Sequence, residues 1–156
     1  MAEAYVGVKL EGFEPIGRFF DRLDLFDKKA LADFVGEEMH AITKEAFKSE
    51  KDPVSGEKWA DLAASTVAKK AKKGENPAKL KQSVVLSRST SYMAFPDGSV
   101  VQGSPMIYSR IHQEGGTAGR GRSVTIPQRR YMGLSEQAIT RIYEDSAVKR
   151  ILGFEE

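Results

Sequence analysis

The clearest hydrophobic pattern lies between residues 28 and 49, where apolar residues recur every three or four positions. The stripe consists of Leu31, Phe34, Val35, Met39, Ile42 and Ala46. This spacing predicts a long surface helix with one buried face, and Asp24 or Asp27 is placed to cap a helix start. Gly36 lies inside the helix at a cost of about 1 kcal/mol relative to Ala, which predicts a close approach of another segment there.

Alternating patterns predict strands elsewhere. Residues 5–11 alternate apolar and polar side chains, as in a half-buried strand. Residues 91–95 and 99–103 flank Pro96-Asp97-Gly98, and an Asp-Gly turn between two such runs is typical of a β-hairpin. A further short strand ends at Pro127. We therefore expect one small, mostly antiparallel sheet built from residues 5–11, 91–95, 99–103 and 122–126.

The remaining pattern predicts helices joined by loops. Helices are expected at residues 13–23, 65–73 and 105–114, the last ended by Gly115-Gly116. Ser135 is placed to cap a final helix. Two segments are expected to be extended: an arm or loop at residues 50–82 and a flexible Gly/Arg loop at residues 115–122. Together these elements predict a single α+β domain over residues 1–156, with the sheet packed against the long helix and the C-terminal helix.

Composition narrows the class of protein. The 156 residues (17.2 kDa) are 40% hydrophobic and include no cysteine, which excludes a disulfide framework, thiolate metal ligands and a cysteine nucleophile. No apolar run reaches the roughly 20 residues of a membrane span, and the first residues lack the pattern of a secretory signal. We therefore expect an ordinary globular domain without a membrane partner.

The net charge of +2 conceals an asymmetry along the chain. Residues 1–66 hold 9 Lys and Arg against 14 Asp and Glu, whereas residues 67–156 hold 15 against 8. The basic candidates for contacts with phosphates or with a partner protein are Lys69, Lys70, Lys72 and Lys73, followed by Arg120 and Arg122. Such charges bind phosphates without reading sequence; the alternative is that they only solvate an exposed helix and loop.

No arrangement of residues predicts catalysis, a metal site or a cofactor. The two histidines are His40 and His112; three and four positions before His112 lie Ser109 and Tyr108, neither of which is a typical metal ligand. The glycines of residues 115–121 follow a helix and precede a strand, the wrong order for a phosphate-binding loop. An enzyme is therefore the weakest of the functional hypotheses.

Three blocks of residues, in order along the chain, resemble motifs of one known family. The first runs from Pro53 through Trp59 to Thr66, the second from Tyr108 to Gly116, and the third from Ile126 to Ser135. The matching positions are Pro53, Gly56, Trp59, Leu62, Thr66, Tyr108, His112, Gln113, Gly115, Gly116, Pro127, Arg129 and Gly133. The chain resembles the phage virion morphogenesis family, tail-completion or neck proteins of Mu-like tailed phages. The chain departs from the family motif near Val84, where it lacks a glycine that the family usually has.

This resemblance implies a structural virion protein rather than an enzyme. Copies would form a ring that joins tail to head, sixfold by analogy with tail symmetry. The ring would contact neighbouring neck and tail-tube proteins, with Arg120 and Arg122 facing DNA in the channel. The protein would reside in the virion neck, and in the host cytoplasm during assembly. The alternative function is non-specific nucleic-acid binding by the basic region 67–130.

The motif residues are expected to have structural roles. Trp59 would pack the Pro53–Gly56 turn onto the core. His112 and Gln113 would satisfy backbone groups at the end of their own helix. Residues 127–133 would form a rigid crossing from strand to last helix.

Overall fold

A long helix forms the axis of the molecule. The computed structural model describes residues 27–75, 78–80 and 85–153. Helix α2 spans Lys28–Ser49, as the apolar stripe predicts, and begins at Asp27, whose carboxylate accepts a hydrogen bond from the Ala30 amide at 2.9 Å. The strand expected at residues 5–11 and the helix expected at residues 13–23 lie outside the described residues.

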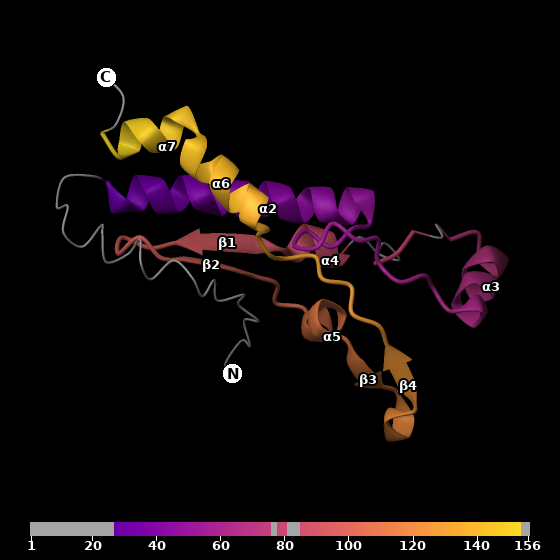
Figure 1. Cartoon of the computed structure of the whole chain (residues 1–156). Coiled ribbons are helices and arrows are strands. Elements are labelled where there is room, and N and C mark those ends of the chain that lie inside the picture. The colour runs from indigo at the N-terminus through magenta and orange to yellow at the C-terminus, as the bar shows by residue number, and fades with distance from the viewer. Residues whose placement is uncertain (1–26, 76–77, 81–84, 154–156) are drawn as a thin grey trace.

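A β-hairpin lies along one side of α2 (Figure 1). Strands β1 (Ser91–Ala94) and β2 (Val100–Gly103) pair antiparallel around the predicted Asp-Gly turn. Tyr92 packs so closely on Gly36 that a Cβ atom at position 36 would overlap its ring. This contact confirms the close approach that the glycine predicts.

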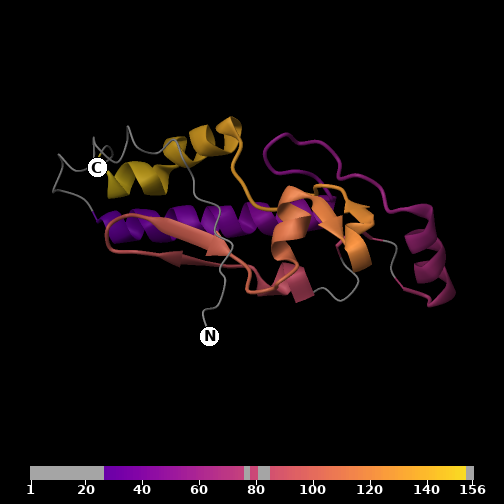
Figure 2. The ribbon, with the colours of Figure 1, turned by 90° about the horizontal axis from the view of Figure 1, so that it is seen from below.

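The C-terminal helices cover the opposite side of α2 (Figures 1 and 2). Ser135 caps α6 (Glu136–Glu144) as predicted, since its hydroxyl accepts from the Ala138 amide at 3.2 Å. The expected single helix is wrong in its extent: the chain breaks at Asp145, which caps the separate helix α7 (Ser146–Ile151). The core between these helices and α2 contains Val35, Met39, Leu134, Ile142 and Val148.

A second, separate sheet corrects the expected single sheet. Strand β4 (Val124–Ile126) pairs with β3 (Gly116–Ala118) and not with the β1–β2 hairpin. The prediction that residues 115–122 form a loop is therefore wrong in part, because they contain β3 and the 3-10 turn η1 (Arg120–Arg122). The β3–β4 hairpin follows helix α5 (Ser109–Glu114) and projects away from α2 (Figure 1).

The segment expected as an extended arm contains one helix. Helix α3 (Ala64–Lys72) lies at one end of the molecule, apart from α2 (Figure 1). Contacts within the arm bring its two ends together: the Lys79 amide donates to the Glu50 carboxylate at 2.8 Å, and Lys51 forms a β-bridge with Lys58. A short helix, α4 (Val85–Ser89), leads from the arm to β1.

Candidate functional site

The three motif blocks meet in one packed cluster beside the end of α2. Tyr131 and Met132, both fully buried, join Ala46 and Phe47 of α2, Trp59 of the arm and Leu86 of α4 in a hydrophobic core. Trp59 of the first block and Met132 of the third, 73 positions apart in the sequence, thus share one environment. We call this set of residues the motif cluster.

Gln113 connects α5 to the third block. Its side-chain oxygen accepts hydrogen bonds from the amides of Tyr131 and Met132, both at 3.1 Å, and its Nε2 donates to the Met132 carbonyl at 2.8 Å. Gln113 therefore satisfies backbone groups, but those of the crossing segment. The prediction that it serves the end of its own helix is wrong.

His112, its neighbour, has a different environment. Its ring lies edge-on to Tyr108 at 6.0 Å between centroids, and its buried Nδ1 has no hydrogen-bond partner among the described residues. Burial lowers the pKa of His112, and the nearby charge of Arg129 lowers it further. The expectation that its side chain satisfies the helix end is wrong; the His112 backbone carbonyl instead accepts from the Arg129 amide at 2.8 Å.

Aromatic side chains fill the centre of the motif cluster. The rings of Phe47 and Tyr131 are 5.0 Å apart, and Trp59 meets Phe47 edge-on at 5.8 Å. The Trp59 indole donates to the Arg130 carbonyl at 2.7 Å, so its polar end is satisfied. Burial raises the pKa of Tyr131 to about 12, and its hydroxyl donates to the Ser109 carbonyl at 3.3 Å.

Arg129 is a buried link between the arm and the crossing segment. Its guanidinium donates to the carbonyls of Ala60 and Asp61, both at 3.0 Å, and the residue is 6% exposed. Burial lowers the pKa of Arg129. Arg129 thus holds the arm against the crossing segment, and its guanidinium does not face solvent.

The first block forms a turn that closes over the third. The Asp52 carboxylate accepts from the Val54 amide at 2.8 Å, and the turn ends at Gly56, whose φ is 75°. Val54 approaches Gly133 so closely that a Cβ atom there would lie 2.6 Å from Val54 Cγ2. Trp59 and Val54 together pack this turn on the body, as the motif predicts for Trp59.

The remaining motif positions mark the borders of elements. Leu62 and Thr66 are half-buried where the arm enters α3, and Pro127 follows β4 directly. Gly115 ends α5 with a φ of 75°, and a Cβ atom at this position would lie 3.0 Å from the Gln128 amide nitrogen. Glycine is needed there both for conformation and for space.

The basic candidates divide into exposed and engaged groups. Arg120 is exposed in η1, at the end of the β3–β4 hairpin, and Arg122 lies in the same turn. Lys69 and Lys72 are exposed on α3. Lys70 is buried and donates to the Ala78 carbonyl at 2.9 Å, and the Lys73 ammonium lies 3.8 Å from the Glu75 carboxylate.

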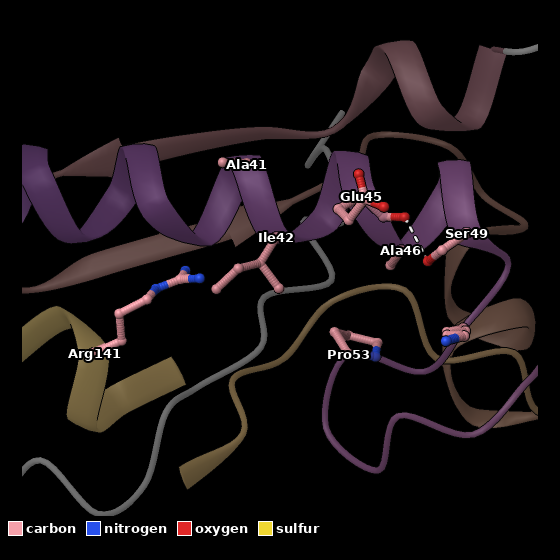
Figure 3. Close-up of a pocket in the computed structure, with 8 residues that line it drawn as sticks. Ala41, Ile42, Glu45, Ala46, Ser49, Pro53 and Arg141 are labelled. Carbon is pink, nitrogen blue, oxygen red and sulfur yellow. Dashed lines mark hydrogen bonds between the residues drawn. The ribbon is translucent and has the colours of Figure 1, made fainter. Parts of the chain in front are cut away.

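A groove of about 310 Å³ lies between α2, the first motif turn and α6 (Figure 3). It is lined by Ala41, Ile42, Glu45, Ala46, Ser49, Lys51, Pro53 and Arg141. Arg141 and Pro53 lie on the same side of α2 in this view, and the Ser49 hydroxyl donates to the Glu45 carbonyl at 2.8 Å. The lining mixes apolar groups with charges of both signs, so it does not favour one charged ligand.

The sequence pattern does not predict the roles of Phe47, which belongs to the motif cluster, and Val54, which packs beside it on Gly133. Phe47 lies one position beyond the last residue of the predicted α2 stripe, so it was not assigned to the buried face. Val54 was counted only as part of a turn. Within residues 27–75, 78–80 and 85–153, no group of three or more His, Asp or Glu could hold a metal ion, and no helix could span a membrane.

Comparison with known proteins supports the family resemblance that the three motif blocks indicate. A model of the phage virion morphogenesis family matches residues 13–151. The chain is 34% identical over 111 residues to a protein of Escherichia phage Mu named "Putative capsid assembly protein G", covering 70% of each chain. It is also 36% identical over 90 residues to the Mu-like prophage FluMu G protein 2 of Haemophilus influenzae, covering 52% of this chain and 65% of that one. No solved structure matches.

The family match extends from before α2 to the end of α7 and includes all three motif blocks. In the structure these blocks supply packing and backbone hydrogen bonds. Phage virion morphogenesis is a structural and assembly role. The chain belongs to the phage virion morphogenesis family.

Proposed function

We propose that this protein is a neck component of a tailed phage that completes the tail and joins it to the DNA-filled head. One observation carries the proposal: the family's motif residues build a packed base from which the β3–β4 hairpin projects, with Arg120 at its far end (Figure 1). A packed base with a projecting basic hairpin suits a shaped subunit of an assembly.

In this proposal, copies of the chain form a ring coaxial with the tail, sixfold by analogy with tail symmetry. Its neighbours are the tail-tube and other neck proteins, in the host cytoplasm during assembly and then in the virion neck. The charge asymmetry supports such stacking, since the acidic half of one copy can meet the basic half of the next. The relative from phage Mu, whose printed name refers to capsid assembly, supports an assembly role.

The β3–β4 hairpin would face the DNA channel. Arg120 is exposed, whereas Arg129 at the base of the same segment is buried, so of these two cations Arg120 is the one that can contact DNA. Arginine side chains contact phosphates without reading base sequence. A channel needs this property, because DNA of any sequence must pass.

Charge reversal tests the channel assignment. The variant Arg120→Glu, Arg122→Glu should lower infectious titre by about tenfold or more through poor DNA retention or delivery, because it replaces attraction to phosphates by repulsion. The matched control, Arg88→Glu with Arg150→Glu, makes the same change in net charge at exposed positions on α4 and α7. Normal DNA retention and delivery in the hairpin variant would refute the assignment.

A second candidate is non-specific nucleic-acid binding by the basic region 67–130. The exposed Lys69 and Lys72 on the outlying helix α3 favour it (Figure 1). The buried Lys70 and Arg129 weaken it, because both already bond to carbonyl groups of the chain. Binding to DNA that falls steeply with salt would support this candidate, and no binding at low salt would reject it.

A further inference from the structure

The outer face of the β1–β2 hairpin is apolar and exposed. Tyr92 and Gln102 are paired across the strands and face α2, where the Thr43 hydroxyl donates to Gln102. The next pair, Met93 and Val101, points to the other side because side chains alternate along a strand. Met93 is 51% exposed and Val101 38%, and Phe95, directly after β1, is 36% exposed.

This face lies next to the point where the described chain begins. A Cβ atom on Gly98, in the hairpin turn, would lie 3.6 Å from the Cβ of Lys28 in the first turn of α2. The 26 residues that precede Asp27 therefore join α2 at a point next to the hairpin turn. Each strand has four residues and spans about 13 Å, so this length of chain is more than sufficient to return along it.

The chemistry of the preceding segment fits an apolar face. Residues 1–26 contain four of the chain's eight phenylalanines. Within them, Val6, Val8 and Leu10 alternate with Gly7 and Lys9, which places the three aliphatic side chains on one side of an extended segment. Burial of such side chains is favourable because it removes apolar surface from water, and Met93 and Val101 offer a surface of the same character.

We propose that residues 6–10 pack on the outer face of the β1–β2 hairpin of their own chain, with Val6, Val8 and Leu10 against Met93 and Val101. In this arrangement the β1–β2 hairpin forms a middle layer, with α2 on one face and residues 6–10 on the other. The proposal is independent of the function in the neck, because it concerns the single chain.

Thiol protection tests whether the face is covered. The chain contains no cysteine, so Met93→Cys and Val67→Cys each give full-length proteins with one thiol. Val67, on α3, is 44% exposed and serves as the reference. We expect a bulky maleimide to modify Met93→Cys at least about tenfold more slowly, because modification requires local opening of the packed segment.

A pair of neighbouring substitutions assigns the protection to residues 6–10. Adding Val8→Lys to Met93→Cys should restore fast modification, since it places a charge in an apolar contact. Adding Lys9→Gln, one position along and on the opposite side, should leave the thiol protected. Fast modification of Met93→Cys in the otherwise unchanged chain, or protection that survives Val8→Lys, overturns the proposal.

Crosslinking determines which copy supplies the segment. Val101→Cys is combined in turn with Val6→Cys, Val8→Cys and Leu10→Cys, and oxidised at a concentration where light scattering gives the monomer mass. A disulfide within the monomer, in at least one pair, is the expected result. Covalent dimers show that a second copy supplies the segment, and absence of any crosslink shows that another part of the chain covers the face; both overturn the proposal.

Discussion

Gln113 joins two motif blocks by bonding to backbone groups that would otherwise be buried without partners. Three hydrogen bonds connect its amide to Tyr131 and Met132, in a segment that has no regular secondary structure. A buried polar backbone group without a partner costs about 1–3 kcal/mol. One side chain therefore stabilises the conformation of the whole crossing from β4 to α6.

Replacing this side chain should be costly. Gln113→Ala leaves two amides and one carbonyl without partners, and we expect the free energy of unfolding to fall by about 2–4 kcal/mol. Gln128→Ala is the control, because Gln128 is exposed and loses a single hydrogen bond to the Gln113 carbonyl. Urea denaturation measures both; equal losses in the two variants would contradict the role assigned to Gln113.

His112 should make stability depend on pH. Burial and Arg129 lower its pKa from the ordinary value of 6.5, so the unfolded chain binds this proton more readily than the folded chain. The free energy of unfolding should therefore decrease as the pH falls below 6.5. His40 acts in the same direction, since burial and Lys44 also lower its pKa.

Denaturation at about pH 7.5 and about pH 5.5 checks this sign. We expect a smaller free energy of unfolding at the lower pH, and a smaller difference between the two in His112→Gln. The carboxyl groups of Asp61 and Asp97 have pKa values below 3.8, so they remain ionised in this range. An unchanged pH dependence in His112→Gln would show that another group titrates.

At the scale of single residues, the sequence predicts which residues belong to the site but not which groups they contact. The motif pattern identified Trp59, Gln113 and Arg129 as structural, and all three are buried in or beside the motif cluster. Their partners were not predictable, because each bonds to carbonyls or amides between 18 and 71 positions away. Local spacing carries no information about such distant backbone groups.

At the scale of elements, local sequence patterns predict where helices and strands lie, but not which strands pair with each other. The apolar stripe and the Asp-Gly turn predicted α2 and the β1–β2 hairpin almost to the residue. The strand expected at residues 122–126 is present as β4 (Val124–Ile126), but it pairs with β3 in a second sheet, which the sequence does not predict because Gly115-Gly116 indicates only a helix end. In the structure Gly115 ends α5 and Gly116 begins β3, so one pair of glycines serves two elements.

Gly36 sets the distance between α2 and β1. In an ordinary exposed helix, Gly→Ala stabilises by about 1 kcal/mol. Here the new methyl group would overlap the Tyr92 ring, so Gly36→Ala should instead lower the free energy of unfolding by about 1–3 kcal/mol. The double variant with Tyr92→Ala removes the overlap, and thermal denaturation should show that Gly36→Ala costs much less in that background.

At the scale of the whole molecule, family membership predicts assembly. Light scattering after size exclusion, followed by negative-stain imaging of any large species, should find closed rings with a central hole, either of the isolated protein or after its addition to tails. Images of the ring would also give its symmetry, which the structure of a single chain does not show. Finding the protein at the tip of the tail, away from the head, in assembled virions would contradict the neck assignment.

The link between Trp59 and Arg130 also constrains the order in which the chain can fold. These residues are 71 positions apart, and the Phe47 ring packs on Tyr131 in the same core. During synthesis, Phe47 and Trp59 emerge long before residues 129–132 exist. Until then their aromatic side chains lack the partners on which they pack in the folded chain. Such transiently exposed apolar surface favours aggregation. We therefore expect the nascent chain to be most prone to aggregation before residues 129–132 have been synthesised.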